Sequence, residues 1–335
     1  MSTIDTRKQA IIHWLTDTIK LEIIHFEPAS SDASFRRYFR VTHQKGQHIV
    51  MDAPPEKENT EPFIRIAALL TKHSVNIPDI VQQDIKQGFL LLEDFGSQCF
   101  LDLLSDSTAD KFYSSAFDSL FQMQNSINTD TCQLPLYDKA LLDSELVLFY
   151  QWFLLQTLNL SIPENLKISL NQLLISSALE QPQVCVHRDY HSRNLMVLKH
   201  NSPGIIDFQD AVIGPITYDL VSLLRDCYIA WPEHKIEQWI TQYFQHITEL
   251  GLINTSLESF TRWFDLMGVQ RHLKAIGIFS RLYLRDNKPG YLQDIPRTLN
   301  YVSQICHKYP ELAEFNHYLN QQVLPVYQKN YLKNP

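Results

Sequence analysis

The chain has 335 residues, 44% of them hydrophobic, and carries a formal net charge of −8. Its length suits two packed lobes, and its negative charge argues against nucleic acid as a partner. The most apolar stretch, residues 147–155, is too short to span a bilayer, and the N-terminus has no apolar signal core. The five cysteines are scattered without a Cys-x-x-Cys pair, which is typical of the reducing cytoplasm. We therefore expect a cytoplasmic protein with neither a membrane segment nor a nucleic-acid partner.

The first part of the chain predicts short strands and two helices. Strands are predicted at residues 38–41, 48–52 and 88–96, and helices at residues 6–21 and 61–72. The second helix places Phe63, Ile66 and Leu70 on one face, which is typical of packing against a sheet. The polar run at residues 30–37 is expected to form a turn before the first strand.

Helices predominate after residue 96. The predicted helices cover residues 109–124, 145–160 and 166–179. The middle helix follows a cap signal, Asp143-Ser144, and is apolar on most sides. We therefore expect it to be deeply packed, with its aromatic residues in the core.

A polar loop between two apolar strands organises the rest of the chain. Residues 184–186 and 195–198 are short, apolar and partly β-branched, as buried strands are. Between them lie a carboxylate and an amide five positions apart, Asp189 and Asn194. Thirteen residues after Asn194, a third apolar strand ends at Asp207. Three polar side chains thus stand at the ends of apolar strands.

This spacing is the catalytic-loop pattern of kinases, His-Arg-Asp-x-x-x-x-Asn followed by Asp-Phe. Phosphoryl transfer needs a carboxylate that orients the attacking hydroxyl and accepts its proton, and Asp189 is the candidate base. It also needs hard oxygen ligands for Mg²⁺, and Asn194 and Asp207 are the candidates. The alternative interpretation is that Asp189 and Asn194 are turn residues and that Asp207 caps a helix. The order of the three residues and their strand-loop-strand context favour catalysis.

Residues 187–194 and 206–210, His-Arg-Asp-Tyr-His-Ser-Arg-Asn and Ile-Asp-Phe-Gln-Asp, resemble the aminoglycoside phosphotransferase-like family, a branch of the protein kinase-like fold. The family often carries a second histidine two positions after the aspartate, as His191 does here. It also has a later Tyr-Asp-Leu on a helix, matched by residues 218–220. The residues that the resemblance implies as supports of the catalytic loop are His187 and Asp219.

The same resemblance implies an α+β, bilobal fold with ATP and Mg²⁺ as cofactors. The small β-rich N-lobe would span residues 1–95, and the larger, mainly helical C-lobe residues 96–335. In the family, backbone groups of the hinge between the lobes bind adenine, and Glu93 and Phe95 stand at that position. The alternative interpretation of this segment is an ordinary strand and turn.

The resemblance places the family's phosphate-covering hairpin in the polar run before residue 38. Kinases use glycines there, whereas this chain has none before Gly46. The residues implied as nucleotide contacts are Ser31, Ala33, Ser34 and Arg36. The phosphate-pairing lysine of kinases would stand near Met51, so the chain departs from the pattern. Either Arg36, Arg37 or Arg40 supplies that positive charge, or transfer runs without it; the alternative is a solvated strand face.

The acceptor is expected to be a small molecule. Residues 211–217 are too short to form the activation segment on which protein kinases hold a protein substrate. Residues 270–286 and 291–297 resemble the anomeric kinases of cell-wall sugar recycling, which phosphorylate N-acetylmuramate and N-acetylglucosamine at the anomeric hydroxyl. Two alternatives stay open: a kinase of the same fold acting on an aminoglycoside, choline-like or other amino-alcohol acceptor, and a catalytically inactive binding module. The sequence does not give the oligomeric state.

A basic stripe is predicted on the helix that contains residues 271–285. Its members are Arg271, Lys274, Arg281 and Arg285. Because the chain is acidic and N-acetylmuramate carries a carboxylate, part of the stripe is a candidate acceptor site. The residues assigned to acceptor binding are Arg271, Lys274 and Asp210. The alternative interpretation is a solvated stripe on a surface helix.

Overall fold

The computed structural model describes residues 5–31 and 35–332, and it divides into two compact units. The first unit comprises Met1–Ser119 and Asn194–Asp210, and the second comprises Leu120–Arg193 and Ala211–Pro335. The first unit therefore extends beyond residue 95 and includes a segment that follows the catalytic loop. The lobe boundary derived from the sequence stays a prediction.

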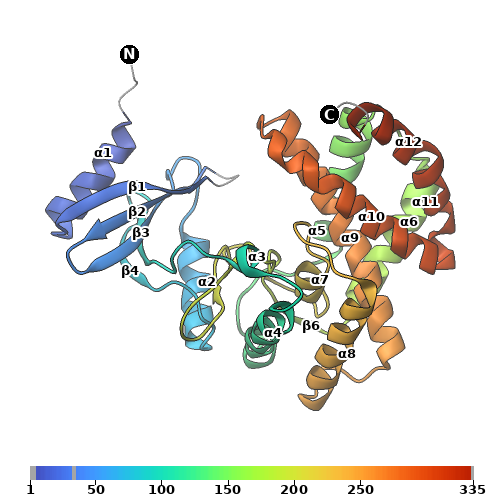
Figure 1. Cartoon of the computed structure of the whole chain (residues 1–335), viewed down its shortest axis with the longest axis horizontal. Helices are drawn as coiled ribbons and strands as arrows, with labels where there is room; N and C mark the ends of the chain where they lie inside the picture. Colours follow the sequence, from blue (N-terminus) through green and yellow to red (C-terminus); the bar gives the residue numbers. More distant parts are fainter. Residues whose placement is uncertain (1–4, 32–34, 333–335) are drawn as a thin grey trace. The chain divides into compact units, whose positions relative to one another are not determined.

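The first unit is built around a five-stranded antiparallel sheet with strand order β1-β2-β3-β5-β4 (Figure 1). The strands of this unit are β1 (Ile23–Ser31), β2 (Arg37–His43), β3 (Gly46–Asp52), β4 (Ile80–Asp84), β5 (Phe89–Glu93), β7 (Leu195–Met196) and β8 (Gly204–Ile205). Its helices are α1 (Thr6–His13), the π-helical turn η1 (Trp14–Thr18), α2 (Glu61–Lys72), α3 (Phe100–Leu103) and the first part of α4 (Ala109–Ser126).

One face of the sheet packs against α1 and η1. Alternate strand residues point to the same face, which brings Phe39, Val41 and Val50 into one buried cluster. Ile11 and Trp14 from the N-terminal helical segment complete this cluster. The helix predicted over residues 6–21 is thus confirmed as α1 followed by η1, and its apolar face is buried.

The sequence identified α2 correctly but missed β1. Phe63, Ile66 and Leu70 of α2 are buried, as the helical periodicity predicts. β1 is an edge strand that contains Pro28, and its Ser31 pairs with Arg37 of β2. The prediction of a turn beginning at residue 30 was therefore wrong for its first residues. Edge strands give a weak sequence signal because proline and half-exposed polar residues are tolerated there.

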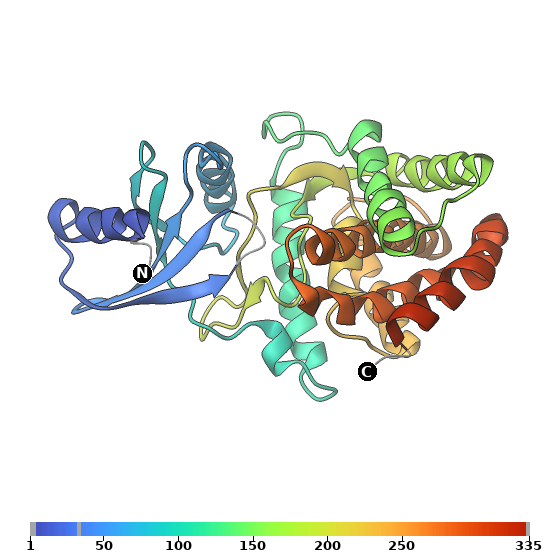
Figure 2. The same cartoon turned by 90° about the horizontal axis from the view of Figure 1, so that it is seen from above.

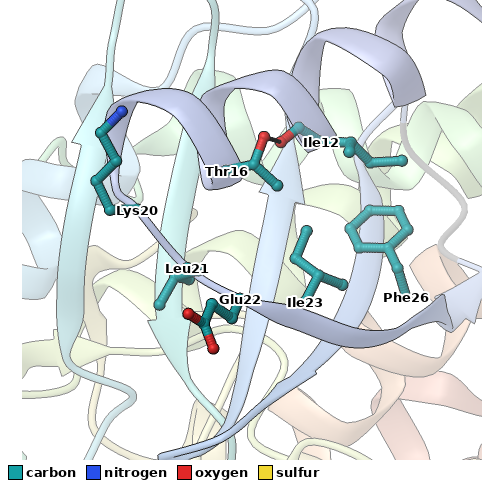
Figure 3. Close-up of a pocket in the computed structure, with 7 residues that line it drawn as sticks. All are labelled: Ile12, Thr16, Lys20, Leu21, Glu22, Ile23 and Phe26. Carbon is teal, nitrogen blue, oxygen red and sulfur yellow. Dashed lines mark hydrogen bonds between the residues drawn. The ribbon is translucent and has the colours of Figure 1, made fainter.

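A cavity of about 510 Å³ lies beside β1 in the first unit (Figure 3). It is lined by Ile12, Thr16, Lys20, Leu21, Glu22, Ile23 and Phe26. The hydroxyl of Thr16 donates to the carbonyl of Ile12 at 3.0 Å, so it is used within the helical segment. None of the predicted site residues lines this cavity.

The second unit is mainly helical. Its helices are the end of α4, α5 (Lys139–Leu148), the π-helical η2 (Phe149–Thr157), α6 (Glu164–Leu179), α7 (Tyr218–Leu224), α8 (Glu233–Glu249), α9 (Leu257–Leu284), α10 (Ile295–Lys308), α11 (Ala313–Tyr318) and α12 (Leu324–Tyr327). Four short helical segments are η3 (Pro289–Asp294), η4 (Pro310–Leu312), η5 (Leu319–Val323) and η6 (Gln328–Leu332). Its strands are β6 (Gln183–Val186) and β9 (Val212–Pro215), which pair antiparallel.

The long helix α9 lies at the centre of this unit (Figure 1). It contacts α5, α6, α7 and α10, so it is surrounded by other helices over most of its length. Figure 2 shows the orange-to-red helices at the C-terminal end of the chain from a second direction. Because α9 is enclosed, polar residues on it need partners from neighbouring elements.

The helix predicted over residues 145–160 begins earlier than expected. Asp138, and not Asp143-Ser144, is its N-cap, and the Asp138 carboxylate accepts the Leu141 N–H at 2.9 Å. Ser144 lies inside the helix and donates to the carbonyl of Leu141. Aspartate and serine occur both at caps and inside helices, so the sequence alone did not distinguish the two positions. The predicted deep packing is confirmed, because Leu146, Phe149 and Phe153 are buried.

No helix among residues 5–31 and 35–332 is long and apolar enough to cross a bilayer.

Candidate active site

The segment after β6 is held by a buried carboxylate. Asp219, in the first turn of α7, accepts the backbone N–H groups of His187 at 2.7 Å and Arg188 at 3.0 Å. Arg188 has a positive φ of 77°, a conformation that costs energy for a residue with a Cβ atom. The two hydrogen bonds to Asp219 stabilise this strained backbone immediately before Asp189.

The far end of the same loop is held in the same way. Asp226, which follows α7, accepts the Ser192 N–H at 2.9 Å and the Ser192 hydroxyl at 2.5 Å. Asp219 and Asp226 are both fully buried. The loop is therefore fixed at two points by carboxylates from either end of one short helix.

Asp189 lies between these two points and is half-buried. Its N–H donates to Nδ1 of His187 at 3.2 Å, and its carbonyl accepts the N–H of His191 at 3.0 Å. Burial raises the pKa of the Asp189 carboxyl, but the positive charges of Lys274, His191 and Arg271 outweigh it, so the net pKa is lowered. Asp189 is consequently ionised at neutral pH, as a proton acceptor has to be.

A third buried carboxylate, that of Glu145 on α5, binds three groups. It accepts Nη2 of Arg188 at 2.5 Å, Nζ of Lys274 at 3.0 Å and the hydroxyl of Tyr137. Lys274 also donates to the hydroxyl of Tyr218 at 3.0 Å. Burial raises the pKa of Glu145, and the charges of Lys274 and Arg188 more than reverse that effect. The sequence analysis missed Glu145; its one signal was an acid in an apolar helix.

The predicted basic stripe on α9 is not uniformly solvated. Arg271 and Lys274 are 5% and 8% exposed, whereas Arg281 is half-buried and Arg285 is exposed. The alternative interpretation of a solvated stripe is therefore wrong for its first two members. Both lie close enough to Asp189 for their charges to lower its pKa.

Asn194 and Asp207 lie together in the first unit, where Asn194 directly precedes β7 and Asp207 follows β8, the strand that pairs with β7. The side-chain nitrogen of Asn194 lies 3.4 Å from a carboxylate oxygen of Asp207, and the Ile206 N–H donates to the Asn194 carbonyl. Gln209 donates to the other carboxylate oxygen at 2.8 Å. Asp207 has a positive φ of 66°, a second strained position.

The donor set of this pair suits a hard cation. Carboxylate and amide oxygens are ligands for Mg²⁺, which usually takes one or two protein groups and completes its shell with water and phosphate. In the described part of the chain, no group of three or more His, Cys, Asp or Glu residues could hold a metal. The Asn194 and Asp207 side chains therefore fit a magnesium ion that completes its coordination shell with water and phosphate oxygens. Phe208 packs on Phe63 of α2 with ring centroids 4.7 Å apart, which anchors this segment.

Three arginines near the start of β2 have different partners. Arg37 donates to the buried carboxylate of Asp52 at 2.6 and 2.9 Å. Arg40 forms a bidentate pair with Asp94 at 2.6 and 3.0 Å. Arg36 pairs with Glu58, which precedes α2, at the longer distance of 3.3 Å. The acid partners of these arginines were not anticipated from the sequence.

The remaining predicted nucleotide contacts are distributed around the sheet. Ser31 ends β1, Glu93 ends β5, and Phe95 is buried two residues later. Ala33 and Ser34 lie outside the described residues. Met51 is fully buried within β3, between Tyr38 and Leu90 on the neighbouring strands.

The predicted site residues fall into two groups, one in each unit. The group in the second unit contains Asp189, His187, Asp219, Arg271 and Lys274. The group in the first unit contains Asn194, Asp207, Asp210 and the nucleotide candidates, and Asp210 is exposed.

Comparison with known proteins identifies relatives along most of the chain. The family described as "Phosphotransferase enzyme family" matches residues 25–253. An N-acetylmuramate/N-acetylglucosamine kinase of Pseudomonas putida (strain KT2440) is 47% identical over 290 residues, which is 85% of each chain. A kinase of the same name from Neisseria meningitidis serogroup B is 38% identical over 316 residues, covering 92% of this chain and 93% of the relative.

Solved structures with low sequence identity share the fold. The choline kinase LicA of Streptococcus pneumoniae has a TM-score of 0.65 at 14% identity, covering 89% of this chain and 99% of that one. The ADP-bound aminoglycoside phosphotransferase APH(2'')-Ib has a TM-score of 0.59 at 14% identity, covering 90% and 99%. The predicted α+β, protein kinase-like fold is confirmed by these similarities and by the antiparallel sheet and mainly helical second unit.

Proposed function

Because this chain belongs to the phosphotransferase enzyme family, we propose that it transfers the γ-phosphoryl group of ATP to the anomeric hydroxyl of N-acetylmuramate and N-acetylglucosamine. One observation carries the choice of acceptor: relatives that are 38–47% identical over 85–92% of this chain are named kinases of these two sugars. The scattered cysteines support a place in the cytoplasm, where ATP is available. The reaction would return cell-wall sugars to metabolism.

In this proposal Asp189 is the residue that meets the acceptor. Its ionised carboxylate orients the sugar hydroxyl and takes its proton as the oxygen attacks the γ-phosphorus. The new oxygen–phosphorus bond forms while the bond from the γ-phosphorus to the bridging oxygen breaks, and ADP leaves. The hydrogen bonds from His187 and Arg188 to Asp219 support this role, because they fix the backbone that presents Asp189.

Asn194 and Asp207 are the proposed ligands of Mg²⁺. When bound, the ion neutralises charge on the β- and γ-phosphates. The protein's contribution is to hold one amide and one carboxylate near each other on a segment anchored by Phe208 and Phe63. The strained backbone at Asp207 supports a functional role, since such strain persists where a side chain has to be aimed.

Arg36 is the proposed substitute for the phosphate-pairing lysine of kinases. Arg37 and Arg40 each hold a carboxylate with two N–H groups at 2.6–3.0 Å, so their charges are committed to the fold. Arg36 lies beside the polar run assigned to the nucleotide, and Glu58 orients it much as an acid orients the kinase lysine. Ser31, Ala33 and Ser34, with backbone groups of Glu93 and Phe95, are the other proposed nucleotide contacts, and Asp210 is a further proposed acceptor contact.

The test is a panel of acceptors with purified protein, radiolabelled ATP and Mg²⁺. We expect phosphorylation of the two acetylated amino sugars, with loss of the reducing end, because the anomeric hydroxyl is the group that becomes esterified. Transfer to kanamycin, choline or ethanolamine in place of the sugars would contradict the proposal. Retention of the reducing end would show that another hydroxyl is the acceptor. Absence of transfer to any acceptor would support the inactive binding module.

A further inference from the structure

Several buried or half-buried cations in the second unit have acidic partners. Arg225 pairs with Asp265 at 2.7 Å, and Arg188 and Lys274 pair with Glu145 at 2.5 and 3.0 Å. Such pairing is expected, because a buried charge is costly unless it is compensated. Arg271 on α9 differs from them, because it is buried and forms no ion pair with any carboxylate in the described part of the chain.

Arg271 is 5% exposed, and its contacts are weak for a guanidinium. Its Nη1 lies 3.8 Å from the sulfur of Cys227, and its Nε has no hydrogen-bond partner among the described residues. A guanidinium stays protonated in proteins, so this charge is not removed by deprotonation. The site therefore holds a permanent positive charge with unused donors, in electrostatic range of Asp189.

Lys274 lies three residues further along α9 and differs from Arg271. Its ammonium group donates to Glu145 and to the hydroxyl of Tyr218, each at 3.0 Å. These contacts make Lys274 a positioning residue within the buried cluster. Of the two candidates for the acceptor carboxylate, the contacts favour Arg271.

A second buried atom near Asp189 also has no partner. Nδ1 of His191 is buried and has no hydrogen-bond partner among the described residues. The His191 and Tyr228 rings form a T-shaped pair with their centroids 5.2 Å apart. The backbone N–H of His191 donates to the carbonyl of Asp189 at 3.0 Å. His191 packs on Tyr228, and Arg271 contacts the adjacent residue Cys227, so Asp189, His191 and Arg271 lie in one part of the second unit. A buried polar atom without a hydrogen-bond partner calls for an explanation, and an absent ligand is one such explanation.

We propose that Arg271 binds a carboxylate of the acceptor, the lactyl carboxylate of N-acetylmuramate, and that His191 binds a polar group common to both sugars. The proposal rests on the proposed function, since it concerns the acceptor of that reaction. Arginine binds carboxylates through two parallel hydrogen bonds, which matches the unused donors of Arg271. N-acetylglucosamine lacks the carboxylate and gains nothing from this contact.

A different role for Arg271 makes a different prediction. If its charge served only to keep Asp189 ionised, its loss would lower kcat for both sugars and would move the acidic limb of the pH–rate profile upward. Carboxylate binding instead changes KM for the acidic sugar alone. The two roles are therefore separable by comparing an acidic acceptor with neutral ones.

The experiment compares three acceptors: N-acetylmuramate, its neutral amide, and N-acetylglucosamine. In Arg271→Gln we expect KM for N-acetylmuramate to rise about 10- to 100-fold, the scale of one charge-assisted hydrogen bond, with little change for the neutral sugars. Arg271→Lys should keep part of the preference for the acid, and it replaces the glutamine variant if that protein does not fold. Arg285→Gln, on the same helix but exposed and paired with Asp286, is the matched control and should change nothing. His191→Phe should weaken the binding of both sugars to the same extent.

Equal effects of Arg271→Gln on all three acceptors would overturn the proposal. So would a wild-type protein that does not distinguish N-acetylmuramate from its amide. If the wild-type protein phosphorylates none of these sugars, the proposed function is wrong, whatever the role of Arg271. Calorimetry with N-acetylmuramate and its amide, on the wild type and on Arg271→Gln, then tests the role of Arg271 separately. Selective binding of the acid by the wild type that is lost in the variant would support this role. Absence of such selective binding would overturn it.

Discussion

Nζ of Lys274 lies 3.0 Å from a carboxylate oxygen of Glu145, and both side chains are buried. Glu145 comes from α5 and Lys274 from α9, so the pair joins two helices that are distant in sequence. Glu145 also binds Arg188, which directly precedes Asp189. One carboxylate thereby connects the core of the second unit to its catalytic loop.

We expect Glu145→Gln to destabilise the protein by about 3–5 kcal/mol, because it leaves two buried cations without their counter-charge. Urea unfolding of the whole protein measures this effect. The matched control is Glu164→Gln, which removes an exposed ion pair with Lys167 and should have little effect. Equal stability of the two variants would show that the ion pairs of Glu145 make no net contribution to the free energy of unfolding.

Asp189→Asn is expected to fold normally and to lose about 10²–10⁴-fold in kcat, the usual contribution of a general base. The amide keeps the size of the side chain but cannot accept the proton of the acceptor hydroxyl. A melting curve checks the fold, and steady-state kinetics with N-acetylglucosamine measures the loss. A folded variant with unchanged kcat would remove Asp189 from the mechanism.

Asn194→Ala and Asp207→Ala are each expected to raise the Mg²⁺ concentration needed for half-maximal activity, because each removes an oxygen ligand. A magnesium titration at fixed ATP measures the change, and excess Mg²⁺ should restore part of the rate for Asn194→Ala. Asp118→Ala, an exposed change on α4, serves as the control. If both site variants show the wild-type magnesium dependence, the ligand assignment is wrong.

Arg36→Met is expected to raise KM for ATP about 10- to 100-fold, the scale of a lost charge-assisted hydrogen bond to phosphate. KM for the sugar should change little, since the residue is assigned to the nucleotide. Arg65→Met, which removes a partly exposed pair with Glu61 on α2, is the control. If Arg36→Met has the same KM for ATP as the wild type, Arg36 does not replace the phosphate-pairing lysine of kinases.

The stability of the protein should depend on the charge of Asp219. Burial raises the pKa of Asp219, and the N–H groups of His187 and Arg188 offset this rise only in part, so the net pKa is about 7. Because the folded-state pKa exceeds that of the unfolded chain, the contribution of Asp219 is full below about pH 4 and is lost as pH rises through about 7. The difference in melting temperature between the wild type and Asp219→Asn should therefore decrease for the wild type as pH rises from about 4 to about 7. A difference that is independent of pH would contradict the raised pKa.

The sequence by itself determined the features that depend on short spacings. The order of Asp189, Asn194 and Asp207 was visible because a catalytic loop is a continuous piece of chain flanked by strands. The same holds for α2, whose buried face follows from helical periodicity. Local signals were ambiguous where the same residue types serve two purposes, as at the N-terminus of α5.

Only the tertiary structure decided which charged residues are compensated. Arg271 and Lys274 stand three positions apart on α9 and look alike in the sequence. Lys274 pairs with Glu145 of α5, whereas Arg271 contacts the sulfur of Cys227 and pairs with no carboxylate among the described residues. Whether a buried charge is satisfied depends on groups that other elements bring within about 3 Å. Those neighbours come from parts of the chain that no local pattern links, so the partners of α9 followed only from the fold.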